Sequence, residues 1–187
     1  MNHMEHFHEE VYGFAQNDLL ALYKKVVEIF PSGSHFVEVG SFLGKSAVFM
    51  AVEIINSGKN IRFDCVDHWK GSEEHHDNKK IDTENLYEDF IKNIEPVKSI
   101  ITPVRIDSID ASKLYHPNSL DFIFIDASHD EPSVRKDLAY WYLRLKEDGM
   151  IAGDDIDDKE VANAVRWFFD IEKVKIVGRQ WLLDLRN

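Results

Sequence analysis

The sequence predicts an α/β domain built on a doubly wound, mostly parallel sheet of seven strands with helices on both faces. Three observations point to this fold. Strand-like and helix-like segments alternate along the chain, and the strand-like segments are apolar on both sides, which is typical of parallel strands covered by crossover helices. As a third observation, only Gly178 and Arg179 separate the last two strand-like segments. This short connection predicts a C-terminal antiparallel hairpin.

The expected elements follow one another with suitable turn and capping residues. We expect strands over residues 35–39, 61–66, 100–106, 120–125, 150–152, 174–177 and 180–185. We expect helices over residues 17–30, 45–57, 84–94, 131–146 and 158–169. Asn17 can cap the first helix, Gly58 ends the second, and Pro132 occupies the first turn of the fourth.

The length of 187 residues fits a single domain over residues 1–187 with one substantial core. Within this domain, residues 1–16 are interpreted as an N-terminal extension and the polar residues 71–83 as a mobile loop. Cys65 is the only cysteine, so we expect no disulfide framework and a reducing, cytoplasmic location. The sequence contains no apolar run of about 20 residues that would predict a membrane span.

The charge balance narrows the range of partners. The chain has 34 Asp and Glu against 22 Lys and Arg, which gives a net charge of −12. Each phosphate contact requires a cation, so this balance argues against nucleic acid and anionic membrane surfaces as partners. It also argues against a polyanionic substrate.

Acidic and small polar residues collect where the expected strands end. The first five strand ends carry, in order, Glu38 and Gly40, Asp67, Asp107 and Ser108, Asp126 and His129, and Asp154 and Asp155. In open α/β sheets, ligands bind beyond the carboxyl ends of the strands. Carboxylates are costly to crowd at one rim unless a cation or a sugar hydroxyl group uses them. The pattern therefore predicts a ligand site at this rim.

The segment after the first strand allows three interpretations. Gly40-x-x-x-Gly44-Lys45-Ser46 is one residue shorter than the phosphate loop of nucleoside triphosphatases and kinases. The dinucleotide pattern Gly-x-Gly-x-x-Gly fails, because Phe42 occupies its second glycine position. The third interpretation includes Glu38, because Glu-x-Gly-x-x-x-Gly is the opening of the cofactor site in S-adenosylmethionine-dependent methyltransferases.

Several motifs in order make the third interpretation specific. Residues 37–46 and 66–69 resemble class I S-adenosylmethionine-dependent methyltransferases. Residues 124–129 and 149–155 are similar to the metal-dependent O-methyltransferases, the group of the catechol, macrolide-sugar and cephalosporin-tailoring enzymes. The resemblance covers roughly residues 33–187.

The resemblance implies a set of cofactor contacts. Glu38 and Gly40 would lie beside the methionine part of S-adenosylmethionine, and Ser46 would bind its amino-acid end. Asp67 would accept hydrogen bonds from the ribose hydroxyl groups, while Asp107 and Ser108 would border the adenine. The full implied cofactor-binding set is Glu38, Gly40, Ser41, Ser46, Asp67, Asp107, Ser108 and Asp126.

The resemblance also implies a set of metal-binding and catalytic residues. Asp126, Asp154 and Asp155 would bind Mg²⁺ or another divalent cation, which lowers the pKa of a bound alcohol and fixes its position. His129 stands where the catechol enzyme has a basic lysine, and an imidazole can accept the substrate proton near neutral pH. His129 and Asp126 are therefore the candidate catalytic residues. Asp126 or Asp130 could instead cap the following helix.

Taken together, these features predict an S-adenosylmethionine-dependent, divalent-metal-assisted O-methyltransferase that acts on a small hydroxylated substrate. Two alternatives stay open, a phosphate-loop-like NTPase or kinase and a non-catalytic cofactor-binding domain of the same fold. A small-molecule partner is expected, with no nucleic acid or membrane partner. A homodimer is also considered, because a chain with little lid structure can complete its site with a second subunit.

Overall fold

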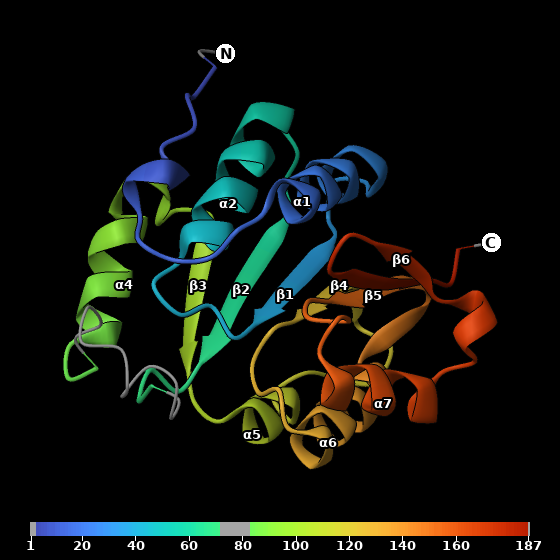
Figure 1. Ribbon diagram of the computed structural model, residues 1–187. Coiled ribbons are helices and arrows are strands. Elements are labelled where there is room, and N and C mark those ends of the chain that lie inside the picture. The colour runs from blue at the N-terminus through green and yellow to red at the C-terminus, as the bar shows by residue number, and fades with distance from the viewer. Residues whose placement is uncertain (1–2, 72–82, 187) are drawn as a thin grey trace.

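The computed structural model describes residues 3–71 and 83–186 (Figure 1). Most of the loop predicted over residues 71–83 therefore lies outside the described residues. None of the described helices has the length and apolar character needed to cross a membrane.

The described residues form one sheet of seven strands in the order β3-β2-β1-β4-β5-β7-β6. The strands are β1 (His35–Val39), β2 (Arg62–Asp67), β3 (Ile101–Arg105), β4 (Leu120–Ile125), β5 (Leu145–Gly153), β6 (Lys175–Val177) and β7 (Gln180–Asp184). The first five pair in parallel, and β7 runs antiparallel to both β5 and β6. The predicted fold class, including the C-terminal hairpin, is confirmed.

Two groups of helices cover the sheet. On one face lie α1 (Asn17–Ile29), α2 (Lys45–Ser57) and α4 (Leu86–Ile94), and on the other lie α5 (Ser108–Ser112), α6 (Glu131–Tyr142) and α7 (Lys159–Phe168) (Figure 1). Short 3₁₀ turns occupy His8–Glu10, Glu95–Val97 and Ile171–Lys173. Alternate strand residues serve the two cores: Phe36 and Phe122 pack toward α1 and α2, whereas Val37 and Ile123 pack toward α6. This two-sided burial is the physical basis of the apolar strands seen in the sequence.

One boundary differs substantially from the expectation. The helix predicted over residues 131–146 ends at Tyr142, and β5 begins at Leu145. Leu145 falls on the apolar stripe of the helix, but its backbone pairs with Leu120 of β4. Strand pairing between distant segments therefore overrides the local helical periodicity.

The N-terminal segment packs on the domain. The His6 ring stacks on Phe49 of α2 with 4.3 Å between ring centroids, and His6 Nε2 lies 2.8 Å from Glu53 Oε1. The buried His8 ring meets Phe49 edge-on. These contacts fix a segment for which the sequence predicts no structure, and they bring residues 13–16 to the carboxyl ends of the strands.

Candidate functional site

A cavity of about 830 Å³ opens at the carboxyl ends of the central strands. Ten of the residues singled out from the sequence line it, namely Gly40, Ser41, Ser46, Asp67, Asp107, Ser108, Asp126, His129, Asp154 and Asp155. Glu38 is not part of the lining, and only 1 % of the residue is exposed. Gly13, Phe14 and Gln16 from the N-terminal segment complete one wall.

Gly40 allows two strand ends to approach each other closely. Its φ is +93°, and a Cβ atom at this position would lie 1.9 Å from the carbonyl oxygen of Asp126. The Gly40 amide donates a hydrogen bond to the carbonyl oxygen of Val66 at 2.8 Å. Only glycine combines this backbone conformation with this contact.

Buried polar atoms without partners lie at the end of β1. The Tyr23 hydroxyl donates to Glu38 Oε2 at 2.6 Å. Within the described residues, Glu38 Oε1 and Ser41 Oγ have no hydrogen-bond partner. Burial raises the pKa of Glu38 above its ordinary value. An unpaired buried acceptor is costly, so this end of the cavity suits a ligand that brings an N–H donor or a positive charge.

Asp67 stabilises two strained residues at the end of β2. Its Oδ2 accepts from the Phe42 amide at 3.0 Å, and its Oδ1 accepts from the Trp69 amide at 2.7 Å. Phe42 and Trp69 have φ values of +46° and +50°, which are rare for residues with large side chains. The Trp69 indole also donates to the Phe42 carbonyl oxygen at 2.7 Å. Asp67 is thus held rigidly at the cavity wall, where its remaining lone pairs can accept from hydroxyl groups.

A third polar group lies beyond β3, at the start of α5. Asp107 caps this helix by accepting from the Ile109 amide at 3.2 Å. The Ser108 hydroxyl donates to Asp137 Oδ1 at 2.5 Å and accepts from the Trp141 indole at 2.9 Å. Burial raises the pKa of Asp137 to about 6. Asp137 was not predicted from the sequence, where its only signal is an acidic residue beside the apolar stripe of the fourth predicted helix.

Ser46 lies in the first turn of α2, facing the cavity. The neighbouring Lys45 Nζ pairs with Glu9 Oε2 at 3.0 Å, a contact that ties the N-terminal segment to this helix.

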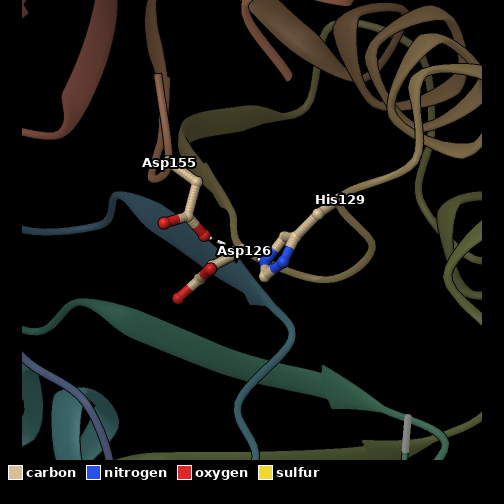
Figure 2. Close-up of side chains that lie close together, drawn as sticks. All are labelled: Asp126, His129 and Asp155. Atoms are coloured by element: carbon tan, nitrogen blue, oxygen red, sulfur yellow. Dashed lines mark ion pairs between the residues drawn. The ribbon is translucent and has the colours of Figure 1, made fainter. Parts of the chain in front are cut away.

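At the other end of the cavity, Asp126, His129 and Asp155 form a compact cluster (Figure 2). One nitrogen or oxygen atom from each residue lies within 4.8 Å of the others. His129 Nε2 lies 2.9 Å from Asp155 Oδ2. Burial, reinforced by the negative charge of Asp154, raises the pKa of Asp126 to about 7. Asp130 caps α6 by accepting from the Ser133 amide, so the capping role considered for Asp126 falls to Asp130 instead.

The structure places Asp154 outside this cluster. Its Oδ1 accepts from Gln180 Nε2 at 3.1 Å and from the Asp155 amide at 2.8 Å. Arg179 forms an ion pair with Asp155, and its Nε lies 3.2 Å from Asp157 and 4.0 Å from Asp154. Asp154 is thus held by Gln180 and the Asp155 amide, whereas Asp126 and Asp155 lie together with His129.

Arg179 and Gln180 have no sequence motif that could have revealed their position. β7 pairs antiparallel with β5, so that Gly153 lies opposite Trp181. This register places the hairpin turn beside the residues that follow β5. The Arg179 amide also donates to Asp18 Oδ2 at 3.1 Å, which anchors the turn to α1.

Residues 37–156 match a protein family described as a methyltransferase domain. The chain belongs to this methyltransferase family. A search of curated protein sequences gave no match.

Three similar solved structures illustrate the fold. The O-methyltransferase NovP has a TM-score of 0.64 and 16 % identity, over 90 % of this chain and 79 % of that chain. An O-methyltransferase from Bacillus cereus in complex with SAH has a TM-score of 0.56 and 19 % identity, over 88 % and 76 %. A precorrin-6y C5,15-methyltransferase from Geobacter metallireducens has a TM-score of 0.60 and 13 % identity, over 85 % and 75 %. At these identities, the likeness establishes the fold alone.

The family assignment identifies the cofactor that the cavity has to accommodate. The protein is an S-adenosylmethionine-dependent methyltransferase of class I. The phosphate-loop alternative is set aside by this assignment. The residues present fit this cofactor. Glu38 Oε1 and Ser41 Oγ, which have no partner within the described residues, can accept hydrogen bonds from its ammonium group, and Asp67 can accept hydrogen bonds from its ribose hydroxyl groups.

Proposed function

We propose that this methyltransferase transfers the methyl group to a hydroxyl oxygen of a small molecule that lies against Asp126, His129 and Asp155. The observation that carries the proposal is the contact between His129 and Asp155 beside Asp126 in the cavity wall. A hydroxyl acceptor is protonated at neutral pH and therefore needs a base such as the imidazole of His129. The acidic rim favours an acceptor that is neutral or carries a modest positive charge.

The proposed cofactor contacts are taken from those that the resemblance implies. Glu38, Gly40, Ser41 and Ser46 would hold the amino-acid end, and Asp67 the ribose. When bound, S-adenosylmethionine supplies a methyl group that is electrophilic because it is attached to a sulfonium sulfur. The protein's contribution is to hold the acceptor oxygen in line with that methyl group and to keep the reacting atoms together.

In this proposal His129 accepts the proton of the acceptor hydroxyl group. An alcohol is a weak nucleophile until it loses its proton, and a correctly placed base supplies about 10²- to 10⁴-fold in rate. Asp155 orients the imidazole ring and stabilises its protonated form. Arg179 holds Asp155 in place through the ion pair on its other carboxylate oxygen. Asp126, beside them, contributes an acceptor for the substrate.

The test uses His129→Gln, with His116→Gln as the matched control because His116 is exposed and outside the cavity. Formation of S-adenosylhomocysteine is measured with a panel of small phenols, catechols and sugars. We expect His129→Gln to lower kcat by roughly 10²-fold or more, with unchanged affinity for S-adenosylhomocysteine. Transfer to nitrogen or carbon acceptors only, or full activity of His129→Gln with a hydroxyl acceptor, would contradict the proposal.

A divalent-metal-assisted form of the same transfer is a second candidate function. It is favoured by the three donor atoms of Asp126, His129 and Asp155, which lie close enough to share one ion. Two carboxylates suit Mg²⁺ or Mn²⁺, and the imidazole moves the preference toward transition metals. The set fits a cation once Arg179 leaves Asp155, and it differs from the predicted set because His129 replaces Asp154. When bound, a cation would stabilise the deprotonated acceptor oxygen.

Chelation and Arg179→Gln distinguish the two forms of the reaction. In the metal-assisted form, EDTA abolishes turnover and added Mn²⁺ restores it. Arg179→Gln then tightens Mn²⁺ binding by up to about fivefold, because a competing surface ion pair has been removed. If turnover is unaffected by EDTA and calorimetry detects no Mn²⁺ binding to either protein, His129 acts without a metal. Absence of turnover under all conditions would favour the non-catalytic cofactor-binding alternative.

The proposal also includes a cytoplasmic location, suggested by the single buried thiol of Cys65, and a homodimer. Light scattering on the purified protein tests the oligomeric state.

A further inference from the structure

Asp137 is a buried carboxylate in the cavity wall to which the functions above give no role. It lies in the second turn of α6, and only 4 % of the residue is exposed. Its Oδ1 accepts from the Ser108 hydroxyl group, which in turn accepts from the Trp141 indole. Within the described residues, Asp137 has no basic partner, and its Oδ2 makes no hydrogen bond.

The cavity thus offers hydrogen-bond acceptors in a defined order. Glu38 belongs to β1, Asp67 ends β2, and Ser108 follows β3 at the edge of the sheet, with Asp137 beside it. S-adenosylmethionine carries donors in a matching order: the ammonium group, the ribose hydroxyl groups and the exocyclic amine of adenine. When the ammonium lies at Glu38 and the ribose at Asp67, the base lies toward Ser108 and Asp137.

We infer that Asp137, oriented by Ser108 and Trp141, selects the adenine base of the cofactor by accepting a hydrogen bond from its exocyclic amine. The Ser108 proton is committed to Oδ1, which leaves Oδ2 for the ligand. A carboxylate accepts but does not donate, so a base with a 6-oxo group in place of the amine would set oxygen against oxygen. Burial raises the pKa of Asp137 to about 6, because no protein cation compensates for the loss of water around the carboxylate. A hydrogen-bond donor from the ligand would stabilise the charged form of this side chain.

The test measures binding, so it needs no acceptor substrate and does not depend on the proposed hydroxyl transfer. Calorimetry compares S-adenosylhomocysteine with S-inosylhomocysteine, which differs in carrying a 6-oxo group on the base. We expect the wild-type protein to prefer the adenine compound by roughly 10- to 100-fold, because a site built to bind a donor rejects an analogue that lacks it.

Asp137→Asn should reduce this preference to within about threefold, because an amide can rotate to accept from an amine or to donate to an oxo group. Asp110→Asn is the matched control, since Asp110 is an exposed carboxylate of the neighbouring α5 that pairs with Lys113. The control should retain the wild-type ratio of affinities.

Two results would overturn the inference. Equal affinity of the wild-type protein for the two compounds would do so even if Asp137→Asn fails to fold. Equal weakening of both compounds by Asp137→Asn, with the ratio unchanged, would assign Asp137 a structural role only. Ser108→Ala gives an independent check, because loss of the hydroxyl group that orients Asp137 should lower the same ratio.

Discussion

The two ends of the cavity are built in different ways. At the cofactor end, Glu38 lies within β1 and Asp67 ends β2, and Asp67 is held by the backbone amides of Phe42 and Trp69. At the acceptor end, Asp155 depends on Arg179, which comes from a hairpin turn 24 residues away. The contacts of Asp67 therefore depend on the pairing of β1 with β2, whereas the contacts of Asp155 depend in addition on the C-terminal hairpin that pairs with β5.

The largest effect should come from the glycine that joins the two ends. Gly40→Ala would force a Cβ against the Asp126 carbonyl oxygen, and we expect a loss of about 3 kcal/mol or more in the free energy of unfolding. Gly33→Ala is the matched control, because φ is +96° there and nothing lies within 4 Å of the added atom. It should cost only about 1–2 kcal/mol of backbone strain. Urea denaturation measures both, and equal losses would show that close packing at Gly40 is unimportant.

A smaller effect is expected from Glu38→Gln at the cofactor end. The amide oxygen can keep the hydrogen bond from Tyr23, but the charge and the free acceptor are lost, so affinity for S-adenosylhomocysteine should fall by roughly 10- to 100-fold. Because burial raises the pKa of Glu38, the variant should be at least as stable as the wild-type protein near neutral pH. Calorimetry measures the affinity and thermal denaturation measures the stability. Glu28→Gln, a substitution at an exposed position, is the control. Unchanged binding would remove Glu38 from the cofactor site.

The smallest effect concerns pH at the acceptor end. The pKa of Asp126 is raised to about 7 in the folded protein, so the folded state holds this proton more tightly than the unfolded state does. The contribution of Asp126 to stability is therefore fully present below about pH 4 and is lost as the pH rises through about 7. The side chain of Asp126→Asn cannot ionise. The free energy of unfolding of this variant should therefore exceed that of the wild-type protein by about 1 kcal/mol or more at pH 8 and should equal it near pH 4. A constant difference across this range would contradict the assigned pKa.

The same contrast explains which features could be read from the sequence. Strand ends are visible as apolar runs that stop at Gly40, Asp67 or Asp126, and parallel pairing then brings them to one rim. The position of Arg179 could not be predicted, because it depends on the register between β5 and β7. Asp137 was missed for a related reason. On a helix, an acidic residue next to an apolar stripe usually faces solvent, and only the packing of α5 against α6 buries this one.

The Trp69 indole, which donates a hydrogen bond to the Phe42 carbonyl oxygen, can serve as an intrinsic fluorescence probe. Trp69 lines the cavity and is otherwise buried against Phe90, whereas Trp141 and Trp181 lie within the opposite core. Any ligand that displaces water from the wall beside Phe42 and Asp67 changes the surroundings of the Trp69 indole. Intrinsic fluorescence can therefore follow occupancy of the cofactor end without a label and without knowledge of the acceptor.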